Sequence, residues 1–301
     1  MITYLLNNYH LLLGGAVLGA GGGTLTGFFG AGGGFIITPA LNIFLGLEMN
    51  MAVGTSACQV LGASTFSLCN HLDRRLMGIK VAICAGLGIP LGTFCGSRLV
   101  KAMKGLPAWN INNMAVDPVN VILLGIFSVF LLLIGGWMLF DNFYLRRHCD
   151  DDENKHVGIM YTLRIPPLGR FRTVPAGPFS IPVLVFLGGI MGFLSGLLGI
   201  GGGVIMLPML FYAVGQETKF ATHTDMMLIF LSGAFSTLFH AIDHNINYPL
   251  AVAMMAGAFV GAGVGAKLQK KTRAKSIRQY FSLEVLAAWL LVMYKLVRIL
   301  K

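Results

Sequence analysis

Two glycine-rich segments are the parts of this sequence best suited to bind a ligand. GFFGAGGGFIITPAL covers Gly27–Leu41, and GLLGIGGGVIMLPML covers Gly196–Leu210. Glycines ahead of a proline make a poor continuous helix, since each glycine costs about 1 kcal/mol relative to alanine and proline about 3. A helix that restarts at Gly33–Gly34 or Gly202–Gly203 presents unpaired N–H groups and the positive end of its dipole, which suits an anion. The alternative is that the glycines only allow a tight turn.

Small polar residues follow each glycine motif in the next stretch of the chain. Thr55 and Gln59 stand four residues apart, so they share one face of a helix, and Thr224 stands at the matching place in the second copy. These side chains either line a polar path or only hydrogen-bond across a helical bundle. The predicted substrate-binding residues are Gly32, Gly33, Gly34, Thr55, Gln59, Gly201, Gly202, Gly203 and Thr224.

Four ionisable residues lie within or at the ends of these stretches, where a charge is costly if lipid surrounds it. His71 and His240 occupy matching positions, and histidine titrates near neutral pH. His223 and Asp225 stand in ATHTDM, where the first copy reads AVGTSA. We predict a proton-coupling or gating role for all four residues. The alternative is that they cap helix ends or form interfacial hydrogen bonds.

Motifs for other kinds of chemistry do not occur in the sequence. It contains no nucleophile–base motif, no Walker phosphate-binding sequence and no His/Cys spacing typical of a metal site. The 5 cysteines include no CxxC pair, and packing is their expected role. We therefore expect no enzyme activity, no cofactor and no bound metal.

The elements that position these residues must be membrane helices. Hydrophobic residues make up 55% of the chain and charged residues only 11%, against about 25% charged in soluble domains. Two polar stretches, Met51–Asn70 and Lys219–His240, are long enough to cross inside a bundle. The net charge of +10 comes from Lys and Arg in short loops, so it indicates topology and not nucleic-acid binding. Apolar runs long enough to span a core about 30 Å thick are Leu11–Phe29, Met77–Leu99, Val119–Phe140, Ile181–Leu198, Pro249–Ala266 and Tyr280–Val297.

The two glycine motifs belong to an internal duplication. Gly27 matches Gly196 at an offset of 169 residues, and the same offset aligns Thr55 with Thr224 and His71 with His240. Between the copies lies a charged and proline-rich segment that is too polar to span a membrane. We predict a first transmembrane repeat at 1–141, a polar linker at 142–178 and a second transmembrane repeat at 179–301.

The basic loops predict the orientation of the repeats. If the two helical pieces on either side of each glycine motif count as two membrane segments, each repeat has five segments and the two halves are inverted. If the two pieces count as one segment, each repeat has four segments and the halves are parallel. Only the odd count collects most Lys and Arg on one side, as the positive-inside rule expects. We therefore predict an inverted 5+5 arrangement with a cytosolic linker and both termini outside the cell membrane. Because Phe35–Leu45 is short for a crossing, the glycine-rich pair is expected to be re-entrant or tilted.

The GxxGxGGGxxxxPxL pattern, present in both halves, resembles the TauE/SafE family of sulfite and organosulfonate exporters. The matching positions are Gly30, Gly32, Gly33, Gly34 and Pro39, with Gly199, Gly201, Gly202, Gly203 and Pro208 in the second half. The resemblance implies transport of small sulfur oxyanions such as sulfite, thiosulfate or sulfonates, coupled to the proton gradient. ATHTDM departs from the small-polar pattern of the family, which leaves the substrate and the coupling ion open.

Together these observations predict an all-α integral membrane protein of 8–10 transmembrane segments, built from two homologous repeats with broken glycine-rich helices. The predicted function is secondary transport, with alternating access around a central anion site formed by the two breaks. The alternatives are an anion channel, and a membrane scaffold or sensor without transport activity. The expected partners are a small anionic substrate and the lipid bilayer, without nucleic acid, and a homo-oligomer is left open.

Overall fold

A computed structural model of the chain describes most of the two predicted repeats. The described residues are 9–30, 32–71, 78–105, 107, 109–111, 114–116, 118–140, 160, 165–171, 173–174, 177–272 and 274–300. Most of the predicted linker at 142–178 therefore lies outside the described residues, and its boundaries stay a prediction.

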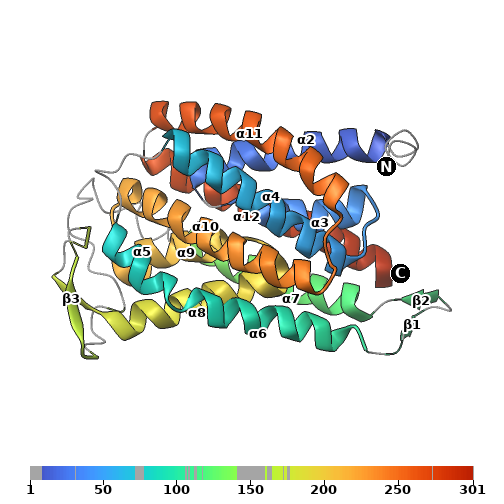
Figure 1. Cartoon of the computed structure of the whole chain (residues 1–301), viewed down its shortest axis with the longest axis horizontal. Coiled ribbons are helices and arrows are strands. Elements are labelled where there is room, and N and C mark those ends of the chain that lie inside the picture. Colours follow the sequence, from blue (N-terminus) through green and yellow to red (C-terminus); the bar gives the residue numbers. More distant parts are fainter. Residues whose placement is uncertain are drawn as a thin grey trace.

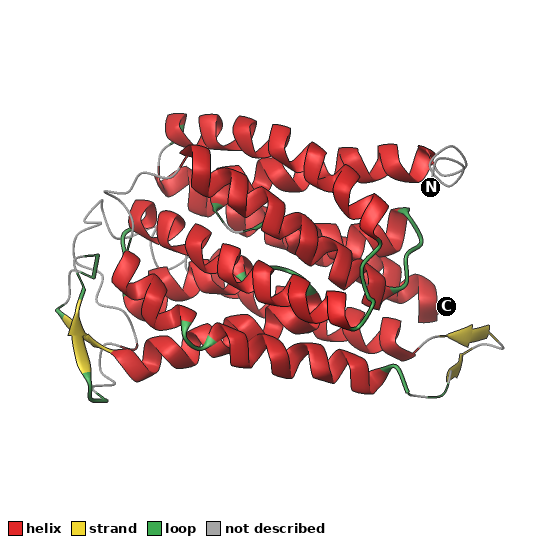
Figure 2. Ribbon diagram, viewed as in Figure 1, coloured by secondary structure: helices red, strands yellow, loops and turns green. Residues whose placement is uncertain are grey.

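Helices dominate the first half of the chain (Figures 1 and 2). A short antiparallel hairpin, which pairs Trp109 with Val116, separates the last two helices. The elements are α2 (Tyr9–Phe29), α3 (Gly34–Phe44), α4 (Met49–His71), α5 (Ile79–Gly86), α6 (Ile89–Met103), β1 (Trp109–Ile111), β2 (Met114–Val116) and α7 (Pro118–Phe140).

The second half repeats this order of helices after a second hairpin, which pairs Leu168 with Ser180. Pro208 is the last residue of the short helix after the glycine motif, and a π-helical turn follows it directly. Proline has no N–H group to donate to the preceding turn, and this favours a break in the α-helical hydrogen-bond pattern. The elements are β3 (Leu168–Arg170), β4 (Pro178–Ser180), α8 (Ile181–Leu198), α9 (Gly203–Pro208), η5 (Met209–Val214), α10 (Thr218–Ile242), α11 (Tyr248–Lys271) and α12 (Ala274–Leu300).

Lengths and composition make this a multi-pass membrane protein. Among the described residues, 6 helices are long and apolar enough to cross a membrane, namely α2, α7, α8, α10, α11 and α12. The pair α5–α6 makes a seventh candidate, although it bends by 43° at its break, a bend that the continuous apolar run Met77–Leu99 does not predict. The 11-residue α3 is about 16 Å long at 1.5 Å per residue, about half of the apolar core.

Glycines interlock the two repeats through close helix contacts. A Cβ atom placed on Gly19 of α2 would lie 2.1 Å from the carbonyl oxygen of Met254 in α11, and one on Gly188 of α8 would lie 1.8 Å from that of Ala85 in α5. Both members of the second pair follow from the first by the 169-residue offset. Glycine is therefore required where these backbones touch. The same relation holds for Gly23–Ala258 with Gly192–Ile89, and for Gly27–Ala262 with Gly196–Thr93.

Because each repeat packs some of its helices against the other repeat, the protein forms two helical bundles that do not coincide with the two halves of the sequence. The first bundle contains α2, α3 and α4 of the first repeat with α11 of the second, and the second bundle contains α8, α9 and α10 with α5 and α6. Helices α4 and α10 form the seam between the bundles, while α7 and α12 pack on each other.

The two seam helices run antiparallel. A Cβ atom placed on Gly54, early in α4, would lie 3.2 Å from Cβ of His240, late in α10. Farther along α4, Leu61 meets Gly233, which comes earlier in α10. Because α4 and α10 occupy matching places in the two repeats, this is the relation that an inverted repeat requires. Both chain ends lie at one end of the bundle, and the β3–β4 hairpin lies at the other (Figure 1).

Candidate functional site

The two glycine breaks meet at the centre of the seam. A Cβ atom placed on Gly32 would lie 2.9 Å from Ile229 and 3.4 Å from Val60, and one on Gly201 would lie 2.5 Å from Val60 and 3.4 Å from Ile229. Val60 and Ile229 are themselves related by the 169-residue offset, and both are buried. The structure therefore brings the two predicted halves of the anion site together around one apolar contact.

Backbone conformation explains why the motifs consist of glycine. The left-handed region, with φ between 59° and 79°, is occupied by Gly30, Gly32, Gly199, Gly201 and Gly202, and only glycine adopts it without strain. Gly34 has ordinary helical geometry, but a Cβ atom there would lie 3.1 Å from the carbonyl oxygen of Gly199. The motifs thus serve both as turns and as points of close backbone contact.

The two breaks differ in how their backbone donors are used. The N–H group of Gly33 donates to Oγ1 of Thr26 at 2.9 Å, so it is occupied in this conformation. The residue that matches Thr26 in the second repeat is Ser195, whose buried hydroxyl has no partner in the described structure. The matching hydroxyls of Thr26 and Ser195 are therefore used differently at the two breaks, although the glycine motifs are alike in sequence.

Ser56 and Thr38 connect the breaks across the seam. The hydroxyl of Ser56 in α4 donates to the carbonyl oxygen of Gly199 at 3.0 Å and lies 2.7 Å from Oγ1 of Thr38. Thr38 Oγ1 in turn donates to the carbonyl oxygen of Gly34 at 3.0 Å. Our sequence reasoning assigned no role to Thr38, although its place four residues after Gly34, where a hydroxyl reaches back to a helix carbonyl, is a detectable signal.

Gln59 is a buried amide without a partner. Its side chain is fully buried, and neither Oε1 nor Nε2 has a hydrogen-bond partner within the described part of the chain. Nε2 lies 3.6 Å from the position that a Cβ atom on Gly22 of α2 would take, and Ile37 of α3 lies against the same glycine. Because buried polar groups are almost always satisfied, this amide marks a place for water or a ligand beside the first break.

Thr55 and Thr224 have the same use in both repeats. Oγ1 of Thr55 accepts from the N–H group of Asn247 at 3.1 Å, and Oγ1 of Thr224 accepts from the N–H group of Gly78 at 3.0 Å. Each bond lies at the start of α11 or α5, and the two bonds are related by the 169-residue offset. These hydroxyls hold helix starts in place, and a substrate-binding role for them stays a prediction.

The four ionisable candidates lie in different surroundings. Asp225 is fully buried in α10, and neither carboxyl oxygen has a partner in the described structure. His223 is half-buried two residues earlier, with Nδ1 2.8 Å from the carbonyl oxygen of Lys219. His71 is the last residue of α4, and its side chain lies outside the described part of the chain.

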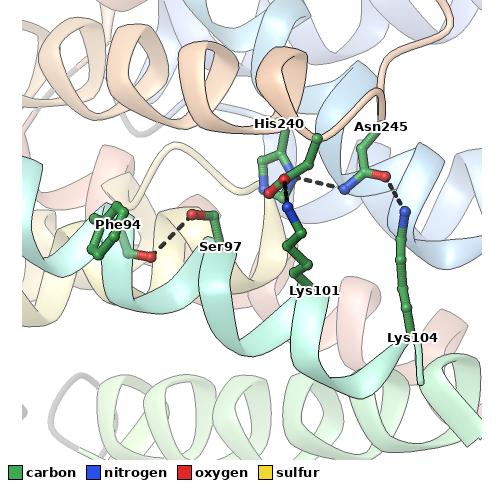
Figure 3. Close-up of polar contacts among 7 residues, drawn as sticks. Phe94, Ser97, Lys101, Lys104, His240 and Asn245 are labelled. Carbon is green, nitrogen blue, oxygen red and sulfur yellow. Dashed lines mark hydrogen bonds and ion pairs between the residues drawn. The ribbon is translucent and has the colours of Figure 1, made fainter. Parts of the chain in front are cut away.

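His240, near the end of α10, belongs to a chain of polar contacts with Asn245 and Lys104 (Figure 3). Its Nε2 donates to the carbonyl oxygen of Gly196 at 2.8 Å, and Nδ1 accepts from Nδ2 of Asn245 at 3.5 Å. Oδ1 of Asn245 accepts from Nζ of Lys104, and Lys101 forms an ion pair with Asp243 at 2.6 Å. The chain suits a neutral imidazole, which has one donor and one acceptor. Sequence reasoning did not predict this use of the four partner side chains.

The helices define a polytopic membrane protein in which two glycine breaks meet between interlocked repeats. Residues 15–292 match the model of the family described as sulfite exporter TauE/SafE, and the chain belongs to that family. The resemblance predicted from the glycine motifs is confirmed.

Two relatives extend the comparison. The chain is 25% identical over 233 residues to the probable membrane transporter protein YunE of Bacillus subtilis, covering 75% of this chain and 77% of that protein. A 66-residue match at 33% identity to the probable membrane transporter protein MJ0441 of Methanocaldococcus jannaschii covers 20% of this chain and 25% of that protein. No solved structure matches the chain.

Proposed function

We propose that this chain is a secondary transporter of small sulfur oxyanions, such as sulfite, thiosulfate or organosulfonates, and that it is coupled to protons in the cell membrane. One observation carries the proposal: two helix breaks from opposite repeats meet at the seam between two bundles, around Val60 and Ile229. Family membership supports the oxyanion class, because the family description names a sulfite exporter.

The surroundings of the breaks suit a small anion held by hydrogen bonds. Helix α9 begins at Gly203 in the second break, and N–H groups at a helix start bind oxyanions, whereas at the first break the N–H group of Gly33 is held by Thr26 in this conformation. Gln59 adds an unused amide donor on the side of the first break, and Ser195 adds an unused hydroxyl on the side of the second. The glycines, Gln59 and Ser195 therefore form the proposed binding site, with Thr55 and Thr224 supporting the helices behind it.

The two-bundle arrangement supports alternating access as the proposed mechanism. The site lies at a seam formed by antiparallel helices, so a tilt of one bundle against the other opens it first to one side and then to the other. In this conformation the break residues are buried and Ser56 bridges the seam to Gly199. Because α11 belongs to the first bundle, and α5 and α6 belong to the second, the moving units are not the two halves of the sequence.

The proposed orientation places the linker in the cytosol and the termini outside. The termini and the β3–β4 hairpin lie at opposite ends of the bundle, and the basic loops supply the direction. The antiparallel seam of α4 and α10 supports the inverted 5+5 arrangement.

Flux measurements on the purified protein test the proposal. Proteoliposomes that contain only this protein should take up labelled sulfite, thiosulfate or sulfoacetate, and an opposing proton gradient should change the steady-state level. The same anions should raise the melting temperature in detergent, because a ligand that binds the folded state stabilises it. Absence of both uptake and stabilisation for every sulfur oxyanion, with carboxylates and sulfate as comparisons, would refute the substrate class.

A further inference from the structure

Asp225 lies on the face of α10 that contacts the two glycine breaks. Three residues earlier, the carbonyl oxygen of Thr222 lies 2.8 Å from the position of a Cβ atom on Gly30. Four residues later, Ile229 contacts Gly32. Residues three and four apart share one face of a helix, so the Asp225 side chain lies between these two contacts, at the seam with the first bundle.

Ser56 occupies the matching position on α4. Three residues earlier, the carbonyl oxygen of Val53 lies 2.3 Å from the position of a Cβ atom on Gly199, and four residues later Val60 contacts Gly201. Between these contacts Ser56 donates a hydrogen bond to the carbonyl oxygen of Gly199, across the seam. The 169-residue register therefore places Asp225 toward the carbonyl oxygen of Gly30 as Ser56 is placed toward that of Gly199.

The two side chains differ in one chemical respect. A serine hydroxyl always has a proton to donate, whereas a carboxyl group can donate to a carbonyl oxygen only when it is protonated. An ionised Asp225 would set a negative charge against a carbonyl dipole in a fully buried place without a partner, which is costly. The closed seam is therefore compatible with a protonated Asp225 and opposed by an ionised one.

We infer that Asp225 carries the coupled proton as a latch across the seam: protonated, it donates to the carbonyl oxygen of Gly30 and closes the site, and it releases that proton to water when the bundles part. The step balances, because the carboxyl O–H bond breaks, an O–H bond to water forms, and the hydrogen bond to Gly30 is lost without any change of oxidation state. This inference rests on the proposed transport function. It names Asp225, and not the histidines, as the residue that converts a proton gradient into opening and closing.

The surroundings of Asp225 contain little other charge. Helices α3, α4, α8, α9 and the π-helical turn η5 contain no Asp, Glu, Lys or Arg. On α10, His223 lies two residues away and so on another face, Lys219 is exposed, and His240 lies at the far end. The remaining titratable groups on elements packed against α10 are Cys58, Cys69 and His71 of α4, Lys80 and Cys84 of α5, Cys95, Arg98 and Lys101 of α6 with Lys104 directly after it, and Tyr212 of η5.

Substitution of Asp225 by serine tests the latch, since serine donates the same hydrogen bond at every pH. The probes are thiosulfate and sulfoacetate, whose charges do not change near neutral pH. Asp225→Ser and Asp225→Asn should retain exchange of labelled for unlabelled probe across proteoliposomes. Both variants should lose accumulation driven by a pH gradient by tenfold or more. Gly21→Ala is the control that should keep gradient-driven accumulation, because it removes no titrating group and its Cβ atom would meet nothing within 4 Å.

Three outcomes separate the inference from the function on which it rests. Unchanged gradient-driven accumulation in Asp225→Ser would overturn the latch, and so would loss of exchange in monodisperse preparations of both variants, which would make Asp225 part of the binding site. If the wild-type protein neither exchanges nor accumulates either probe, the proposed function itself fails. Binding gives a second readout, because probe-induced stabilisation should depend on pH in the wild type and not in Asp225→Ser.

Discussion

Lys101 Nζ and Asp243 Oδ1 lie 2.6 Å apart, which ties the end of α6 in the first repeat to the turn after α10 in the second. The Lys101 side chain is 53% exposed, whereas that of Asp243 is 8% exposed. The turn leads directly into α11, so it passes from the second bundle to the first. Beside the pair, Lys104 binds Asn245 in the same turn. These contacts anchor the turn at the end of the bundle where the chain termini lie.

The first prediction concerns this ion pair. Because one partner is largely exposed, a double-mutant cycle with Lys101→Met and Asp243→Asn should give a coupling free energy of about 1 kcal/mol or less. Lys101→Met alone should destabilise more than Asp243→Asn alone, since it leaves a nearly buried carboxylate unpaired. Reversible unfolding in mixed micelles measures both effects. A coupling that does not weaken at high salt would show that the contact is not electrostatic.

The second prediction concerns topology. In a variant without native cysteines, Leu168→Cys in β3 should be shielded from an impermeant thiol reagent in intact cells, and Trp109→Cys in β1 should be labelled. Both residues are exposed, and their hairpins lie at opposite ends of the bundle. Permeabilised cells provide the control, because both positions should then react. Labelling of Leu168→Cys from outside would reverse the proposed orientation.

The third prediction concerns the glycine contacts between repeats. A Cβ atom on Gly23 would lie 2.3 Å from the carbonyl oxygen of Ala258, whereas one on neighbouring Gly21 meets nothing within 4 Å. Gly23→Ala should therefore destabilise the protein by about 1–3 kcal/mol through overpacking, while Gly21→Ala should be neutral or stabilising by up to about 1 kcal/mol. Gly192→Ala, at the position that matches Gly23, should behave like Gly23→Ala. Equal melting temperatures for Gly21→Ala and Gly23→Ala would contradict the interlocked packing.

Local patterns predicted most of the helices correctly. The apolar run Val119–Phe140 and the observed α7 differ by one residue at their start, and the polar stretch Met51–Asn70 forms a single helix as expected. Both signals are carried by consecutive residues, so no tertiary information is needed to detect them. The 169-residue offset of the duplication also relates Val60 to Ile229, the two side chains that lie against both Gly32 and Gly201.

Contacts between distant segments could not be predicted in the same way. Helix α11 belongs to the first bundle because its backbone packs against Gly19. A glycine in the sequence shows that some backbone comes close, but not which one, and the same holds for Gly188. Likewise, the capping of Gly33 by Thr26 appears only when the turn is folded. Sequence similarity between the breaks therefore concealed the difference in their hydrogen bonding.

The fourth prediction concerns the breaks themselves. Gly202 has a φ of 79°, and a Cβ atom there would lie 2.4 Å from Met191. Gly202→Val and Gly33→Val should each abolish transport and ligand-induced thermal stabilisation, because a branched side chain distorts the turn and obstructs the approach to the helix start. Gly46→Ala is the matched control, since Gly46 also has a positive φ of 64° but open space around it. Normal anion binding by both valine variants would confine the glycines to a structural role.

The fifth prediction separates binding from folding at Gln59. The residue at the matching position of the second repeat is Leu228, so the fold already accommodates leucine there. Replacing a buried amide that has no partner by an apolar group of similar size removes an unsatisfied polar group. Gln59→Leu should therefore leave the melting temperature without ligand unchanged or raise it. The affinity for the transported oxyanion should fall by about tenfold or more, because one hydrogen bond to a charged group contributes about 1.5–3 kcal/mol.

Leu228→Gln is the reverse substitution at the matching position of the second repeat. Leu228→Gln introduces a second buried amide without a partner, so it should lower the melting temperature of the free protein. Added to Gln59→Leu, it should not restore binding; restored binding would show that the two positions are interchangeable about the seam. Titration of the anion against melting temperature gives stability and affinity from one experiment. If Gln59→Leu lowers the stability of the free protein and leaves affinity unchanged, the amide is bound to structural water, and the oxyanion site must be placed nearer to Ser195.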